Sequence, residues 1–191
     1  MKKLILYLFI FSLSLFAEDK NELKKINTFK AIFTENTNLN NRKKTKEYEV
    51  LASLPDKLIK KMISPSINKG EIYLYNGTHK TIYYPLLEQT IDQKIDEDEN
   101  YTLKFIRDLK SNDDNVDFKV VKSHNQIQKI IYNDGITIKF ESFSKINGIN
   151  FPTHVRILDE NIEISELIIK DIEINISLTE KDFSLDEIIK K

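Results

Sequence analysis

The feature that most restricts the fold is a long succession of short segments in which apolar and polar residues alternate, separated by turn residues. In the first of them Phe29, Ala31 and Phe33 alternate with other side chains, and residues 36–41 are expected to turn the chain. In the last, isoleucines at alternate positions of residues 172–178 face one side. Alternation with period two predicts strands. Short turns between about ten or eleven such strands predict an antiparallel meander, and a sheet of that size must curl or close.

Two segments have a helical period instead. Leu103, Ile106 and Leu109 recur at helical spacing with Phe105 beside them, and residues 18–25 are polar and permissive of helix. Several strands are apolar on both sides, whereas residues 172–178 are apolar on one side only. We therefore predict a mainly β (α+β) fold. It is an unclosed antiparallel β half-barrel of about ten or eleven strands, with two or three helices covering its mouth.

The N-terminus has the pattern of a secretory signal peptide, assigned here to residues 1–17. Lys2 and Lys3 precede an uncharged apolar run from Leu4 to Phe16, and Ala17 offers a small residue for cleavage. The run is shorter than the roughly 20 residues of a membrane-spanning helix. An uncleaved tether stays open as an alternative, because Leu15 stands where a small residue is usual. The remainder, 18–191, is predicted to form a single domain that is exported and soluble.

Composition excludes several classes of protein. The chain has no cysteine, which rules out disulfides, thiolate chemistry and a lipidated cysteine. It has 29 basic and 30 acidic residues, and removal of Lys2 and Lys3 leaves 27 against 30. Without a basic block, nucleic acid is not an expected partner.

Candidate catalytic and metal-binding groups are sparse. His79, His124 and His154 lie far apart and form no ligand motif. The four glycines form neither a nucleophile turn nor a phosphate-binding loop. The acidic run 96–99 lacks the spacing of a dedicated calcium site and is typical of a solvated loop. We therefore expect no enzyme activity, no cofactor and no metal.

Residues 70–85 predict a hairpin with an Asn76-Gly77 turn and two apolar faces. Ile72 and Leu74 point to one side of its first strand, and Tyr73 and Tyr75 point to the other. Both faces could pack against protein, or one could be reserved for an apolar ligand. The tyrosines suit the rim of an apolar groove, although tyrosine also simply favours strands.

The stretch from Leu54 to Ile91 resembles periplasmic lipoprotein carriers of the LolA type. No single motif is strong, but the ordered set is: Pro55, Pro65, Asn76-Gly77, Tyr84-Pro85 and Glu88-Gln89. Residues 26–37 and 176–185 are similar to the opening and closing segments of that family. The resemblance covers nearly all of the chain after the signal peptide and is weakest over residues 112–147.

This resemblance implies a soluble, monomeric periplasmic carrier that shields the acyl chains of lipoproteins, or other lipid, in an apolar cavity. Such a carrier takes its cargo from an inner-membrane exporter and delivers it to an outer-membrane acceptor. We expect Leu58 at the mouth, where it would contact the acceptor. We expect the lipid-binding cavity to be lined by Phe29, Phe33, Val50, Leu54, Met62, Ile72, Leu74, Tyr83, Leu103 and Ile106.

One departure concerns the lid of that cavity. Leu54 stands where the best-known carriers have an arginine that latches the helices shut, so closure is expected to rest on apolar contacts, such as Leu23 and Ile26 against Leu103 and Ile106. The carrier interpretation requires a water-excluding hollow large enough for fatty tails. Its alternatives are a non-transporting lipid or lipoprotein sensor, or an envelope interaction module of the same fold, and a hydrolase acting on lipid.

Overall fold

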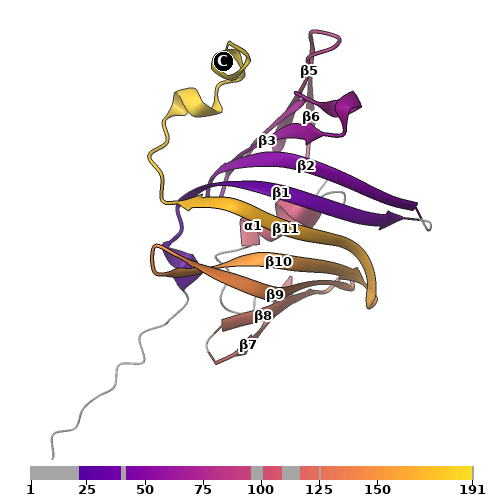
Figure 1. Ribbon diagram of the computed structural model, residues 1–191, viewed down its shortest axis with the longest axis vertical. Helices are drawn as coiled ribbons and strands as arrows, with labels where there is room; N and C mark the ends of the chain where they lie inside the picture. Colours follow the sequence, from indigo (N-terminus) through magenta and orange to yellow (C-terminus); the bar gives the residue numbers. More distant parts are fainter. Residues whose placement is uncertain (1–21, 40–41, 96–100, 109–116, 125, 191) are drawn as a thin grey trace, which may run out of the picture.

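The computed structural model describes residues 22–39, 42–95, 101–108, 117–124 and 126–190. Within them, eleven strands form one antiparallel sheet in the order β6-β5-β4-β3-β2-β1-β11-β10-β9-β8-β7 (Figure 1). The strands are β1 (Thr28–Leu39), β2 (Arg42–Ser53), β3 (Lys57–Ser64), β4 (Ile72–Asn76), β5 (His79–Tyr84), β6 (Gln89–Lys94), β7 (Phe118–Ser123), β8 (Gln126–Tyr132), β9 (Ile136–Ile146), β10 (Ile149–Asp159) and β11 (Ile162–Ile174). The sheet is unclosed, with β6 and β7 at its two edges.

Chain order is kept on each side of the sheet, and the first and last strands meet at its centre. β1 pairs with β2 on one side and with β11 on the other, both antiparallel. The predicted meander is therefore confirmed within each half, whereas the pairing of β1 with β11 was not predicted.

Two strands are longer than their sequence patterns indicate. β1 continues through residue 39, because the Asn36 side chain donates to Glu166 at 3.0 Å and accepts from Thr45 at 2.8 Å, which keeps it in the sheet. A turn starting at Asn36 was thus a wrong prediction. β11 is one strand where the alternating pattern predicts two, 162–170 and 172–178. Asp171 takes a φ of 52° and the register with β1 shifts, so the chain bulges there without ending the strand.

The predicted hairpin consists of β4 and β5. Asn76 and His79 are register partners, so the loop between them is Gly77-Thr78. Gly77 has a φ of 58°, a conformation that glycine adopts without the cost a side chain brings. Asn76 itself remains in the strand.

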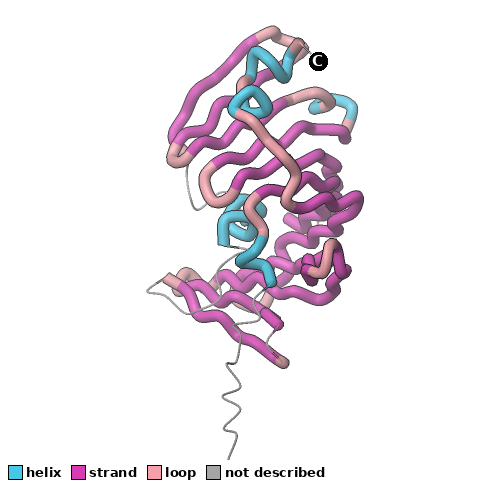
Figure 2. The backbone as a smooth tube through the Cα atoms, turned by 90° about the vertical axis from the view of Figure 1, so that its left-hand side faces the viewer, coloured by secondary structure: helices cyan, strands magenta, loops and turns pink. Residues whose placement is uncertain are grey.

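Within the described ranges, five short helical segments accompany the sheet. They are η1 (Glu22–Lys25), η2 (Ser66–Asn68), α1 (Tyr101–Asp108), η4 (Glu180–Phe183) and α2 (Leu185–Ile189). The sheet curves around the side on which α1 lies (Figure 2), and we call this side the concave face. Among the described helical segments, α1 and η1 bring buried apolar side chains to the same core.

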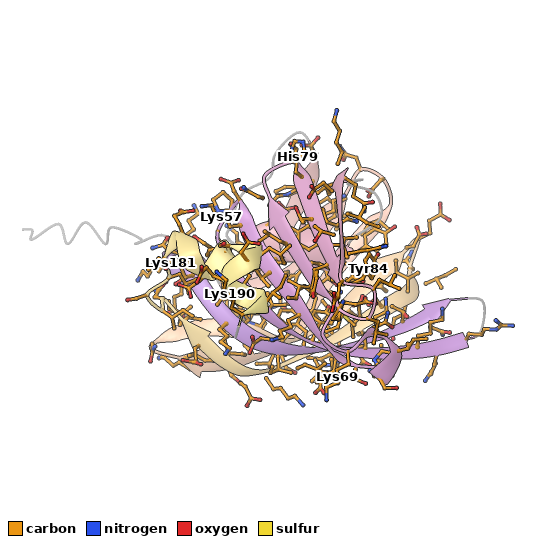
Figure 3. All side chains as sticks on the ribbon, turned by 90° about the horizontal axis from the view of Figure 1, so that it is seen from above. Lys57, Lys69, His79, Tyr84, Lys181 and Lys190 are labelled. Atoms are coloured by element: carbon orange, nitrogen blue, oxygen red, sulfur yellow. The ribbon has the colours of Figure 1, made fainter. Side chains whose placement is uncertain are left out.

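The C-terminal segment packs on the other side of the sheet. Lys57 of β3 binds Glu180 with an Nζ–Oε2 distance of 2.6 Å, and its Nζ lies 5.9 Å from the centre of the Phe183 ring. Figure 3 shows Lys57 beside the yellow helices that carry Lys181 and Lys190. The prediction that the helices cover the mouth thus holds for α1 and does not extend to η4.

Candidate functional site

The concave face of the sheet is a continuous apolar surface. Register partners in an antiparallel sheet share a face, and the pairings Phe29↔Ala52, Ala52↔Leu58 and Leu58↔Tyr75 carry this face across four strands. Phe33 and Tyr48 stack with their ring centres 5.7 Å apart, and Phe29 meets Phe151 edge to face at 5.5 Å. These side chains are buried, so the face is covered rather than open.

Helix α1 supplies much of that cover. Phe105 is fully buried and Ile106 is 2% exposed, and both belong to the same core as the concave face. The Phe105 ring lies 5.9 Å from that of Phe140 on β9. The space beneath α1 is therefore filled by side chains of the protein itself.

Polar contacts fasten the C-terminal half of α1 to β8 and the turn that follows it. The Tyr132 hydroxyl donates a buried hydrogen bond of 2.6 Å to the Asp108 carboxylate. Lys104 places its Nζ 3.8 Å from the centre of the Tyr132 ring and 3.0 Å from an Asp134 carboxylate oxygen. Burial raises the pKa of Tyr132, and the nearby Asp108 carboxylate raises it further, so the hydroxyl stays protonated and acts as the donor.

The start of α1 has a polar contact of its own. Thr102 donates to Glu35 of β1 over 3.4 Å. Leu54 stands where the resemblance to LolA-type carriers implies a latching arginine, and the expectation was that lid closure rests on apolar contacts. That expectation was incomplete. Leu23, Ile26 and Ile106 do share one core, but side-chain hydrogen bonds and an ion pair also hold α1.

A crevice of about 130 Å³ opens beside α1 at the mouth of the half-barrel. Its apolar wall consists of Leu54, Leu58, Tyr75, Ile95 and Ile106, and basic residues lie around it: Lys57, Lys94, Lys104 and Arg107. A cavity of roughly 150 Å³ admits a molecule the size of benzene. The crevice is thus too small for a whole acyl chain while α1 is in place, so it is not the hollow for fatty tails that the sequence led us to expect.

The structure separates the predicted cavity residues into two groups. Phe29, Phe33, Val50, Met62 and Ile106 are buried in the core of the concave face. Leu54 and Leu58 line the crevice, and Leu58 is 5% exposed, so the residue expected to present itself at the mouth is largely enclosed.

The other group lies on the opposite face of the sheet. The register Lys61↔Ile72↔Tyr83 and the neighbouring pair Leu74↔Thr81 place Ile72, Leu74 and Tyr83 away from α1. The Leu103 side chain lies outside the described residues, as do the acidic run 96–99 and the signal-peptide assignment to residues 1–17. Tyr73 and Tyr75 are the hairpin residues that join the core.

Sequence reasoning missed Tyr75 and Phe105 as lining residues and Lys60 as an interior charge. Tyr75 sits in the crevice wall as the register partner of Leu58. Alternation along the hairpin defines two faces, but it does not tell which of them lies on the concave side of the sheet. Phe105 could have been found from its position beside the apolar stripe of α1.

No group of three or more His, Cys, Asp or Glu side chains placed to hold a metal ion is found in the described part of the chain. His154 lies between two carboxylates on the outer face, with its Nε2 2.9 Å from Glu166 and its Nδ1 3.5 Å from Glu141. Arg156 also binds Glu141, at 3.1 Å, so these groups form a surface ion-pair network.

Comparison with known proteins gives structural relatives at low sequence identity. The sequence matches no protein-family model and no curated protein. A LolA superfamily protein from Nitrosomonas europaea superposes with a TM-score of 0.64 at 16% identity, covering 89% of this chain and 97% of that one. A DUF1329 family protein from Desulfovibrio piger gives a TM-score of 0.67 at 11% identity, covering 86% and 92%. A domain named for outer membrane lipoprotein sorting, from Vibrio parahaemolyticus, gives 0.59 at 13% identity over the same shares.

An unclosed antiparallel sheet with a helix packed into its concave face defines the structural class. The chain has the LolA-like fold, as the ordered sequence motifs indicated. Identities this low establish shared architecture and leave activity to be argued from the site. No helix in the described ranges is both long and apolar enough to cross a membrane.

Proposed function

We propose that the protein is a periplasmic carrier that shields the acyl chains of lipoproteins or other lipids and delivers them towards the outer membrane. The observation that carries the proposal is the apolar side of α1. Phe105 and Ile106 fill the concave face, and a crevice runs along the helix at the mouth. Acyl chains are the ligands that such a surface suits, because their contacts are non-directional.

The energetics require a shield of this kind. Each buried methylene contributes about 0.8 kcal/mol, so exposing a chain of about 16 carbons to water costs on the order of 12 kcal/mol. Binding such a chain requires α1 to leave the concave face, which exchanges Phe105 and Ile106 for cargo atoms of similar character. The helix then acts as a lid, and its own side chains occupy the site in the empty state.

The polar contacts suit reversible closure. The Lys104–Asp134 pair is partly exposed and the Thr102–Glu35 contact is long, at 3.4 Å, so each contributes little on its own. The buried Tyr132–Asp108 hydrogen bond is the stronger contact that opening has to break. On this proposal a signal peptide exports the chain, the protein works as a monomer without catalysis, and an inner-membrane exporter and an outer-membrane acceptor are its partners.

The filled interior favours one second candidate. A protein whose α1 never opens would be a non-transporting sensor or interaction module of the same fold. The two proposals differ in whether α1 moves.

Cross-linking tests this difference. Because the chain has no cysteine, a thiol reagent reacts only at cysteines introduced for the experiment. Lys104→Cys and Asp134→Cys, joined by a reducible bifunctional thiol reagent, tie α1 to the sheet. The matched control joins Lys170→Cys and Glu47→Cys, an ion pair of similar length, 2.9 Å, on exposed side chains of the opposite face.

A fluorescent 16-carbon acyl probe is then titrated into each protein. We expect about one probe per control protein, loss of binding in the α1-linked protein, and recovery when the linker is reduced. Equal binding by both linked proteins would show that α1 does not gate the site. Failure of the unlinked, folded protein to bind would overturn the carrier proposal.

A further inference from the structure

A group of polar side chains lies within the otherwise apolar concave face, beneath the first turn of α1. We call Glu35, Lys46, Tyr48, Lys60 and Thr102 the interior polar cluster. Their strands place them together, because Glu35 is the register partner of Lys46, and Lys60 is that of Val50 in the core. Thr102 reaches the cluster from α1.

Lys60 is the unusual member of this cluster. Its side chain is 14% exposed, and its Nζ lies 3.7 Å from the centre of the Tyr48 ring. Its ion pair with Glu35 spans 3.6 Å, longer than a hydrogen bond. Burial lowers the pKa of Lys60, and Glu35 opposes that effect. A buried ammonium with one distant carboxylate is costly in a face that apolar residues could fill.

The cluster also has donors in excess of acceptors. Glu35 is paired with Lys60 and is the register partner of Lys46, whose charge lowers the pKa of Lys60, so two lysines accompany this carboxylate. The Tyr48 hydroxyl is fully buried near Glu35 and Thr102 and makes no well-formed hydrogen bond within the described residues. Burial raises the pKa of Tyr48, which keeps its proton available for donation. The interior therefore offers positive charge and an unused donor, the complement of an anionic oxygen group.

We propose that the interior polar cluster binds the anionic head group of an amphiphile whose acyl chain lies along the concave face. When α1 moves, Thr102 leaves Glu35, and a carboxylate or phosphate of the ligand takes donors from Lys60 and Tyr48. This inference rests on the proposed carrier function and narrows its cargo to lipids with an acidic head. Neutral lipids would fill the same apolar face without using the cluster.

The test compares three twelve-carbon probes that differ only at the head: dodecanoate, dodecanol and dodecyltrimethylammonium. Each competes with the fluorescent acyl probe on the wild type, Lys60→Met, Tyr48→Phe and Lys61→Met. Lys61 is the neighbouring lysine, is exposed on the opposite face of the sheet and serves as the matched control. Glu35→Gln with Lys60→Met removes both charges of the Lys60–Glu35 ion pair and replaces Lys60→Met should that single variant fail to fold.

We expect the wild type and Lys61→Met to bind dodecanoate at least tenfold more tightly than dodecanol. Lys60→Met, or its double variant, should bring that ratio near one while dodecanol affinity stays within about twofold. Tyr48→Phe should lower the ratio of dodecanoate to dodecanol affinity by less than Lys60→Met does. Acetate and inorganic phosphate should not compete at the same concentrations, because the chain supplies the affinity.

Three results would overturn the inference. They are equal binding of acid and alcohol by the wild type, an unchanged ratio in the Lys60→Met background, and competition by acetate or phosphate alone. In each case the carrier proposal survives, because the probes still bind. Binding of no probe by folded wild type would refute the carrier proposal as well, so the two failures are distinguishable.

Discussion

The Tyr132 hydroxyl on β8 donates a buried hydrogen bond of 2.6 Å to Asp108 at the end of α1. This contact joins the helix to the second half of the sheet, on the side of the core away from β6. Loss of this donor leaves the buried Oδ2 of Asp108 without its Tyr132 partner, while Arg107 stays 3.5 Å from Oδ1, and an unpaired buried acceptor costs more than the bond itself contributes.

Tyr132→Phe should therefore lower the free energy of unfolding by about 1–3 kcal/mol. It should also speed binding of the acyl probe, because the lid is less firmly held. Urea unfolding and stopped-flow fluorescence measure the two effects. In Tyr132→Phe with Asp108→Leu both polar groups are gone, and stability should recover. A double variant no more stable than Tyr132→Phe would contradict this account.

Acid should weaken the link between Lys104 and Asp134. Burial alone would raise the pKa of Asp134, but the Lys104 ammonium and the backbone N–H of Ile136 outweigh it and hold that pKa below its ordinary value. The contribution is thus present above an unfolded pKa of about 3.9 and lost as pH falls through the lower folded value.

Asp134→Asn should accordingly be less stable than the wild type at neutral pH, by under about 1 kcal/mol for so exposed a pair. The difference should disappear below about pH 3. Urea midpoints measured from pH 7 to pH 2.5 check this. A gap that widens on acidification would reverse the assigned sign.

Phe105 fills the space that cargo would occupy. Phe105→Ala should lower the free energy of unfolding by about 3–5 kcal/mol, because the ring is fully buried. The acyl probe should restore part of that loss by entering the vacated space. Thermal melts with and without probe measure both effects. Ile162→Ala, an exposed side chain at 70%, is the control and should show neither. Destabilisation without any recovery by the probe would argue that α1 is only part of the core.

The two faces of the β4–β5 hairpin should respond differently to polar substitution. Tyr75→Ser removes a wall of the crevice and should weaken probe binding several-fold. Leu74→Ser, one residue away, lies on the opposite face and should leave binding within about twofold once folding is verified by circular dichroism. If Leu74→Ser proved the more damaging for binding, the cargo surface would lie on the outer face.

Strand positions could be predicted from the sequence because an alternating pattern is local. β3 and β6 lie within a residue of the ranges that their patterns predict, 58–63 and 89–95, and α1 follows the spacing of Ile106 and its neighbours. What could not be predicted depends on partners far along the chain. Asn36 continues a strand because Glu166, 130 residues away, accepts its amide.

For the candidate site, it was harder to predict which face of each strand lies on the concave side of the sheet. Ile72 and Tyr75 are both buried, but on opposite sides of the sheet, so hydrophobicity alone could not assign the lining. Lys60 was overlooked for the same reason, since a lysine in a strand is normally solvent-facing and only its pairing with Val50 places it inside.

The central pairing of β1 with β11 affects how the protein is made. A chain that has not yet reached Ile162 leaves β1 as a twelve-residue edge with no neighbour on one side. Contacts between segments so distant in sequence form slowly. β1 therefore gains its second neighbour, and the two halves of the sheet join, only after residues 162–174 have been made.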